Sequence, residues 1–131
     1  MARVLIVDDS PMMLAFISDV LEKYAKSLYD STWELKISTA ESAMQALELL
    51  KENFYELIIT DIMMSKMDGW EFIKELRKEN SRKDLPIVVV SAIDGVDLKY
   101  GAIRNGASAW FTKPIATKEF SQAIFRLLAE R

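Results

Sequence analysis

A fivefold alternation between short apolar runs and longer segments of helical periodicity constrains the fold of this sequence most strongly. Three of the runs, VLIV, LII and IVVV, are continuously apolar, which is typical of parallel strands covered by helices on both faces. Strands and helices that alternate in this way predict an α/β fold built on a parallel sheet. The expected strands are 3–7, 33–38, 56–60, 86–90 and 109–111.

The segments between the expected strands carry recognisable helix boundaries. Ser10 can act as an N-cap before Pro11 at the first helical position, so a helix is expected from residue 11. The markers of the later helices are Ser42 as a cap, Gly69 before the third helix, Asn105-Gly106 at the end of the fourth and Thr117 as a cap of the last. No repeat or linker divides these elements, so we expect one domain over residues 1–131.

The composition excludes several kinds of chemistry. The chain has no Cys and no His, which rules out disulfides, thiolate or imidazole metal ligands, cysteine nucleophiles and a phosphohistidine within this chain. A net charge of −3 offers no basic field for a nucleic acid. No apolar run approaches the ~20 residues of a membrane span, and the first residues do not form a signal peptide. We therefore expect a cytoplasmic domain that binds neither nucleic acid nor membrane directly.

Polar side chains interrupt the apolar pattern at the ends of four expected strands. Asp8 and Asp9 follow the first strand, Asp61 the third, Ser91 the fourth, and Lys113 comes just after the fifth. The carboxyl ends of the strands in an open doubly wound sheet form one edge, where ligands bind. Each of these residues alone is more often a cap or turn residue, but their coincidence at four strand ends predicts a shared site.

The residue types at this edge indicate phosphoryl chemistry. Three clustered carboxylates repel one another, so a cation is expected among them. Oxygen ligands without His or Cys select a hard cation such as Mg²⁺ (or Mn²⁺). Lys113 supplies a further positive charge, and Ser91 can donate a hydrogen bond to a phosphoryl oxygen. The candidate acceptor is a carboxylate, which can form an aspartyl-phosphate.

Four segments of the chain, VLIVDDSP, LIITDIMMSKMDGWEFI, PIVVVSA and GASAWFTKPI, occur in an order that covers nearly its whole length. In this order they resemble the response-regulator receiver domain of two-component signalling, and the length is similar to the single-domain chemotaxis-type regulators. The resemblance implies an α/β, flavodoxin-like fold with a five-stranded parallel sheet of order 2-1-3-4-5 and helices on both faces.

The resemblance also implies a metal site and an acceptor. Asp61 matches the phosphorylated aspartate of the family. Asp9 matches a direct ligand of Mg²⁺ (or Mn²⁺), Asp8 a ligand through water, and Met63 the residue whose backbone carbonyl completes the protein ligands. A sensor histidine kinase or a phosphotransfer protein would be the phosphoryl donor.

The remaining motif residues match a switch. Lys113 matches the lysine that pairs with the phosphoryl group, and Pro114 the turn after it. Ser91 matches the switch hydroxyl and Trp110 the aromatic ring that turns inward with it. The resemblance implies that the surface of the fourth helix, fifth strand and last helix then changes for a downstream target, in a monomer or a phosphorylation-dependent dimer.

Some positions depart from the family pattern. Ser65 stands where proline is common, and Trp110 is bulkier than the usual ring. Met63 and Ile93 are apolar at positions that tune dephosphorylation, so we expect a long-lived phosphoryl group.

Two other functions stay open on the sequence alone. A haloacid-dehalogenase-like phosphatase would use the same aspartate with Mg²⁺, but that class has a second aspartate where this chain has Met63. A degenerate receiver would act only as an interaction domain, although the phosphorylation residues are all present. We expect a domain that catalyses its own phosphoryl transfer without being a multiple-turnover enzyme, and no output domain in this chain.

Overall fold

The computed structural model describes residues 1–64, 67–93 and 95–130, so the expectation for Ser65 lies outside the described residues. Within these ranges one sheet contains five parallel strands in the order β2-β1-β3-β4-β5. The strands are β1 Ala2–Val7, β2 Leu35–Ala40, β3 Leu57–Thr60, β4 Ile87–Ser91 and β5 Ala109–Thr112. The fold class and the strand order expected from the resemblance are confirmed.

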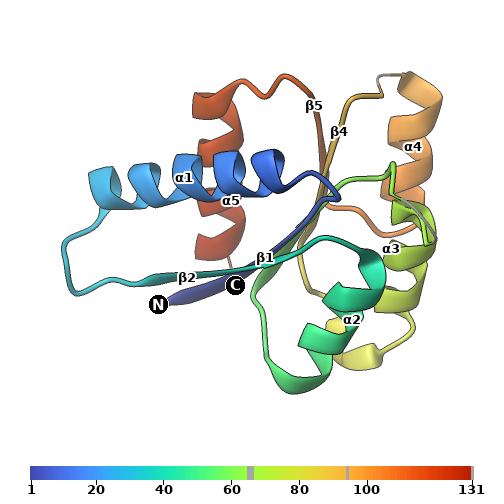
Figure 1. The fold of residues 1–131 in the computed structure, drawn as a ribbon, viewed down its shortest axis with the longest axis horizontal. Helices are drawn as coiled ribbons and strands as arrows, with labels where there is room; N and C mark the ends of the chain where they lie inside the picture. The colour runs from blue at the N-terminus through green and yellow to red at the C-terminus, as the bar shows by residue number, and fades with distance from the viewer. Residues whose placement is uncertain (65–66, 94, 131) are drawn as a thin grey trace.

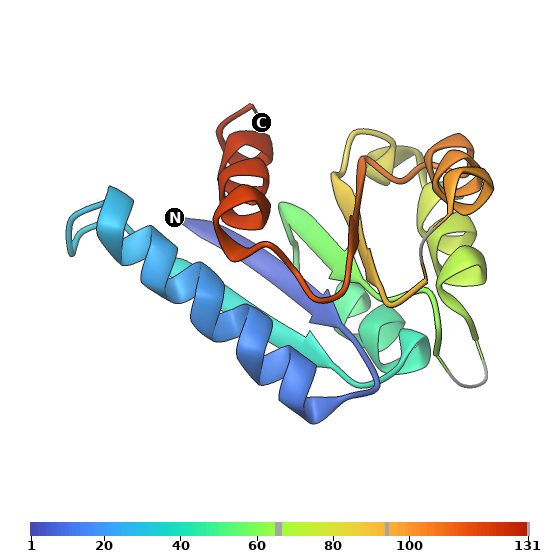
Figure 2. The ribbon, with the colours of Figure 1, turned by 90° about the horizontal axis from the view of Figure 1, so that it is seen from above.

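The helices lie in two layers around this sheet. Their bounds are α1 Pro11–Leu28, α2 Ala43–Glu52, α3 Gly69–Arg77, α4 Val96–Arg104 and α5 Thr117–Ala129, with a short 3₁₀ turn η1 at Asn80–Arg82. Figures 1 and 2 show α1 and α5 on one face of the sheet and α2, α3 and α4 on the other. None of the described helices combines the length and the apolar character that a membrane crossing requires.

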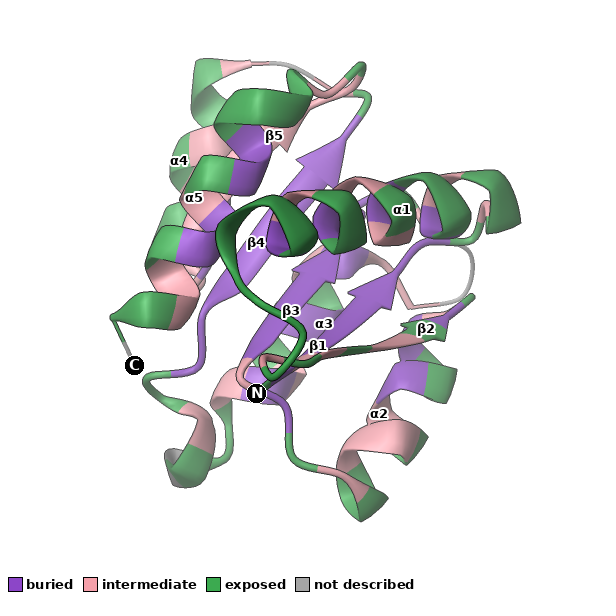
Figure 3. Ribbon diagram, turned by 90° about the vertical axis from the view of Figure 1, so that its left-hand side faces the viewer, coloured by how far each residue is buried: buried purple, intermediate pink, exposed green. Residues whose placement is uncertain are grey.

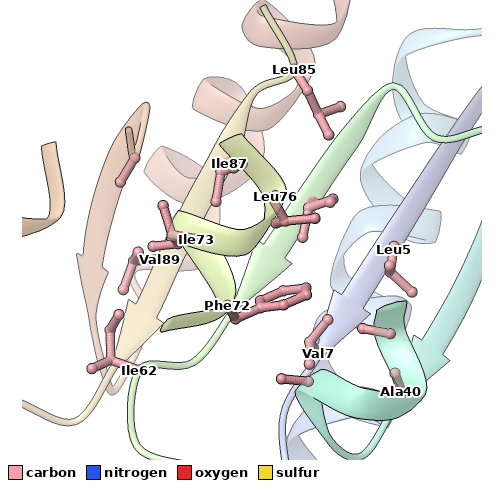
Figure 4. Packing of buried hydrophobic residues seen from close by; sticks show 14 of the residues in the cluster. Leu5, Val7, Ala40, Ile62, Phe72, Ile73, Leu76, Leu85, Ile87 and Val89 are labelled. Atoms are coloured by element: carbon pink, nitrogen blue, oxygen red, sulfur yellow. The ribbon is translucent and has the colours of Figure 1, made fainter. Parts of the chain in front are cut away.

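Covering both faces makes the interior positions of the central strands almost entirely apolar. In β1, Val4 and Ile6 pack under α1 and α5, whereas Leu5 and Val7 pack under the other helix layer. Successive side chains of a strand point to opposite faces, so each strand supplies both layers of core. Figure 3 shows the buried central strands, and Figure 4 shows Phe72 and Ile73 of α3 packed over the second layer.

Most of the expected helix boundaries are confirmed. The Ser10 side chain accepts a hydrogen bond from the Met13 N–H, and Ser42 caps α2 in the same way. Asn105 closes α4, and Gly106 follows it with φ +112°, a left-handed conformation that favours glycine.

Three boundary predictions are wrong. Gly69 does not precede α3 but is its first residue, and the side chain of Asp68 caps this helix. Thr117 does not cap the last helix: it is the first residue of α5, Ala116 holds the cap position, and no side chain caps it. The second strand begins at Leu35 rather than at residue 33, because the Trp33 N–H donates to the carbonyl of Asp30 in a turn and the Trp33 ring stacks on Tyr29.

Candidate functional site

The parallel sheet brings the predicted site residues to one edge. Asp8 follows β1 and Asp61 follows β3, and the preceding residues Val7 and Thr60 are register partners. The Asp61 N–H donates to the carbonyl of Val7 at 3.0 Å, which fixes the two strand ends side by side. On the other side of β3, the Lys113 N–H donates to the carbonyl of Ser91 at 2.8 Å. Backbone pairing therefore places all four strand ends within one small region.

Three carboxylates converge at this edge. One oxygen from each of Asp8, Asp9 and Asp61 lies within 4.8 Å of the others. Asp8 and Asp61 are buried, with 1% and 6% of their surface exposed, whereas Asp9 is exposed at the rim. The cluster therefore has two anchored carboxylates and one that is open to solvent.

Lys113 connects the two buried carboxylates. Its Nζ donates to Asp8 Oδ2 at 2.9 Å and to Asp61 Oδ2 at 3.1 Å. Burial alone would lower the pKa of Lys113, but the hydrogen bonds and the negative charges of Asp8 and Asp61 outweigh it and raise that pKa. The lysine is therefore held charged and compensates part of the negative charge at the edge.

Backbone amides fix the orientation of the same carboxylates. Asp61 Oδ1 accepts hydrogen bonds from the N–H groups of Ile62 at 2.7 Å and Met63 at 3.1 Å. Asp8 Oδ1 accepts one from the Ser10 N–H at 2.9 Å. With Oδ1 held by the backbone, the second oxygen of Asp61 points toward Lys113.

Three other predicted residues lie beside this pocket without joining its ion pairs. Ser91 is fully buried, and its hydroxyl accepts a hydrogen bond from the Ile93 N–H at 3.2 Å rather than contacting a carboxylate of the described residues. Trp110 lies in β5 opposite Val89, with its indole N–H buried and without a partner in the described part of the chain. Pro114 follows Lys113 through a cis peptide bond.

Two residues that shape the site were not assigned to it from the sequence. The Thr60 hydroxyl is buried and donates to the backbone carbonyl of Asp61 at 2.9 Å. The sequence feature that could have identified Thr60 is a polar residue at the end of the otherwise apolar run LIIT. The Gly69 N–H donates to the carbonyl of Ile62 at 2.8 Å, and a Cβ at Gly69 would lie 2.5 Å from the Asp61 carbonyl oxygen. Glycine is therefore required here by space, which the sequence pattern alone did not show.

The donor set fits a hard divalent cation. All three converging side chains offer carboxylate oxygens, which are the ligands that Mg²⁺ and Mn²⁺ prefer, and two of them are already oriented by the protein. The exposed position of Asp9 leaves room for the water ligands that Mg²⁺ retains. Asp8, Asp9 and Asp61 are therefore suited to hold such an ion.

In this structure a lysine bridges two buried aspartates at the carboxyl edge of a sheet whose order, 2-1-3-4-5, defines a flavodoxin-like fold. The model of the response regulator receiver domain matches residues 4–125. The chain belongs to this family, whose role is phosphorylation-dependent signalling in two-component systems.

Individual relatives agree with this assignment. The chain is 31% identical to the heme response regulator HssR of Staphylococcus aureus over 98% of this chain and 51% of that protein. It is 29% identical to the hybrid signal transduction histidine kinase D of Dictyostelium discoideum over 95% of this chain and 7% of that protein. The chain thus spans about half or less of these relatives. Among solved structures, the chemotaxis response regulator CheY4 of Vibrio cholerae superposes with a TM-score of 0.83 at 27% identity, covering 97% and 98% of the two chains.

Proposed function

We propose that the chain, as one receiver domain over residues 1–131, accepts a phosphoryl group on Asp61. The donor would be the phosphohistidine of a sensor histidine kinase or of a phosphotransfer protein, and the similarity to a hybrid histidine kinase supports such a partner. The observation that carries the proposal is the Lys113 Nζ placed between Asp8 Oδ2 and Asp61 Oδ2 in a largely buried pocket. That arrangement puts a nucleophilic oxygen beside a fixed positive charge.

The reaction follows from the contacts of Asp61. Because Oδ1 accepts two backbone hydrogen bonds, Oδ2 is the oxygen that attacks phosphorus as the bond to the donor nitrogen breaks. Lys113 then moves its hydrogen bond from the carboxylate to a phosphoryl oxygen, which keeps the new charge compensated. The family's Mg²⁺ (or Mn²⁺), held by Asp8, Asp9, Asp61 and the backbone carbonyl of Met63, would supply further positive charge for the phosphoryl oxygens.

Ser91 and Trp110 would couple the negative charge of the phosphoryl group to a change in the conformation of the protein surface. The Ser91 hydroxyl now accepts from Ile93, so its own proton can donate to a phosphoryl oxygen that arrives at Asp61. Movement of Ser91 favours a second position of Trp110, and phosphorylation shifts the population between the two states. The surface of α4, β5 and α5, where Val96, Tyr100 and Ile103 of α4 are exposed, would then meet a target protein differently.

The same proposal covers the setting of the domain. It acts in the cytoplasm as a monomer or a phosphorylation-dependent dimer, and it takes one phosphoryl group per chain rather than turning over a pool of substrate. Each phosphoryl group leaves by hydrolysis of the aspartyl-phosphate, a bond that the domain itself makes and loses.

The test is incubation with acetyl phosphate and Mg²⁺, followed by the intact mass of the protein. Wild type should gain one phosphoryl group, and D61N should gain none. D19N is the matched control, since Asp19 is exposed and pairs with Lys23 on α1, and it should react as wild type does. An adduct on D61N, or none on wild type, would contradict the proposal. Release of many phosphates from a phosphoester per chain would favour a phosphatase instead.

A further inference from the structure

Trp70, the second residue of α3, contacts two elements that belong to the proposed output surface. Its ring lies 6.5 Å from the ring of Trp110 in β5, measured between centroids, with 44° between the planes. Its other neighbour is the backbone of α4, because a Cβ placed on Gly101 would lie 3.1 Å from Cη2 of Trp70. Glycine at position 101 therefore lets this indole lie directly against α4.

The backbone of Trp70 is tied just as closely to the acceptor. Gly69, the residue before it, donates its N–H to the carbonyl of Ile62 at 2.8 Å. The space between Gly69 and the carbonyl oxygen of Asp61 is too small for a Cβ. Any displacement of the peptide after Asp61 must therefore be passed to the start of α3 and to Trp70, because tightly packed atoms cannot absorb it.

Trp110 is held in its position by packing rather than by polar contacts. Its indole N–H is buried and has no acceptor among the described residues, which costs free energy in this conformation. What opposes that cost is contact with the core layer under α2, α3 and α4, against which both Trp70 and Trp110 pack as partly buried residues. Because the unpaired indole N–H disfavours this position of Trp110, the loss of one packing neighbour should be enough to shift the ring.

We propose that Trp70 is a positioning residue that couples the loop after Asp61 to Trp110 and to the middle of α4. This inference rests on the proposed function, because it describes how phosphorylation of Asp61 reaches the exposed residues of α4. If the effect of phosphorylation reached α4 through Ser91 and Trp110 alone, Trp70 would contribute only packing to the core. In the route proposed here, α4 responds to phosphorylation only while Trp70 connects it to the loop.

The test compares wild type, W70F and W33F by hydrogen exchange of the amides of α4, with and without acetyl phosphate and Mg²⁺. Intact mass measures the adduct in the same samples. W33F is the matched control, because Trp33 precedes β2 at the opposite edge of the sheet and stacks on Tyr29. We expect phosphorylation to change exchange in α4 by at least about fivefold in wild type and W33F. W70F should form the adduct normally and lose most of this change.

The outcomes separate the two proposals. If wild type forms no adduct, the proposed function fails. If W70F forms the adduct and its α4 responds as in wild type, the coupling is wrong while the proposed function stands. If W70F folds but forms no adduct, Trp70 belongs to the acceptor site and the coupling is equally wrong.

A second experiment measures protein stability, so it depends neither on phosphorylation nor on the W70F variant alone. W70F, W110F and the double variant should change the unfolding equilibrium non-additively by at least about twofold, because the rings share one contact. Additive effects would contradict the coupling. G101A adds a methyl group against Trp70, and it should weaken the α4 response while leaving the adduct intact; an unchanged response would count against the proposal.

Discussion

Replacing Gly69 with alanine should destabilise the protein and disturb the acceptor loop at the same time. The new Cβ would lie 2.5 Å from the carbonyl oxygen of Asp61 and 2.5 Å from Cα of Ile62. Carbon atoms in ordinary contact are separated by about 3.5–4.0 Å, so the start of α3 and the loop must move apart by about 1 Å. The two nearest obstructing atoms belong to the backbone, so rotation of the third, Ile62 Cδ1 at 2.9 Å, would not relieve the clash.

The size of the effect follows from two opposing contributions. Forcing an extra methyl group into a packed site costs about 1–3 kcal/mol, and backbone obstruction places this case in the upper half of that range. Alanine recovers roughly 0.5–1 kcal/mol, because it loses less conformational entropy in a helix than glycine does. We expect a net loss of about 1–2.5 kcal/mol. For a chain of 131 residues this corresponds to a fall in Tm of about 4–9 °C.

The assay is thermal unfolding of G69A beside G95A, followed by phosphorylation with acetyl phosphate. Gly95 is the matched control, because a Cβ there would meet Leu98 Cδ1 at an ordinary 3.7 Å and its φ of 161° is extended. G95A should lose less than about 1 kcal/mol, a loss that arises because Gly95 is the N-cap of α4 and alanine is a poorer cap. G69A should also form the adduct more slowly, since the Asp61 carbonyl is displaced. Equal Tm values for the two variants would refute the steric reasoning.

Four further predictions concern the charges at the edge of the sheet and the lifetime of the adduct. The K113Q variant leaves Asp8 and Asp61 buried without their cation, so its free energy of unfolding in metal-free buffer should fall by about 3 kcal/mol. The control K118Q, on the exposed start of α5, should lose almost none of this free energy. Because the two aspartates raise the pKa of Lys113, its stabilising contribution is complete below the ordinary value of about 10.4 and is lost as the pH rises through the raised pKa. Alkaline titration should therefore destabilise wild type more steeply than K113Q. Mg²⁺ at about 100 times its Kd should raise the Tm of wild type by about 10 °C. The D9N variant should lose this rise and the D19N variant should keep it. An equal rise in D9N would exclude Asp9 as a ligand. M63N should shorten the lifetime of the phosphoryl group, measured by intact mass over time, because the exposed side chain of Met63 cannot orient a water molecule; an unchanged lifetime would show that this position does not control hydrolysis.

The fold class could be predicted because burial on both faces leaves its mark in the sequence. Runs such as VLIV and IVVV are apolar at every position because neighbouring residues of β1 and β4 enter opposite core layers. The strand order is different: no residue pattern in the sequence encodes it, and only the resemblance to a known family supplied it.

The proximity of the candidate site residues was predictable for the same geometric reason, but their individual contacts were not. Parallel strands share one carboxyl edge, so Asp8, Asp61 and Lys113 had to be neighbours. The hydroxyl of Ser91 lies at that edge yet accepts from Ile93, a local choice between hydrogen-bond partners that strand position does not determine. Likewise, Thr117 has the residue type of a cap but lies one position inside α5.

Contacts between distant residues left no local signal at all. Trp70 and Trp110 are far apart in the chain, and each would suit an ordinary half-buried position in its own element. The space requirement at Gly69 likewise depends on how closely α3 approaches the loop after Asp61. Such features follow from the packing of whole elements, which becomes visible only in three dimensions.

The span of the Lys113 ion pairs has a consequence for newly made protein. Lys113 lies 105 residues from Asp8 and 52 from Asp61, so the pocket needs the first, third and fifth strands at once. A nascent chain that is still missing β5 carries both aspartates but no bridging lysine. The bridged pocket, and any reaction that needs all three side chains, therefore exists only after β5 has been made and has joined the sheet.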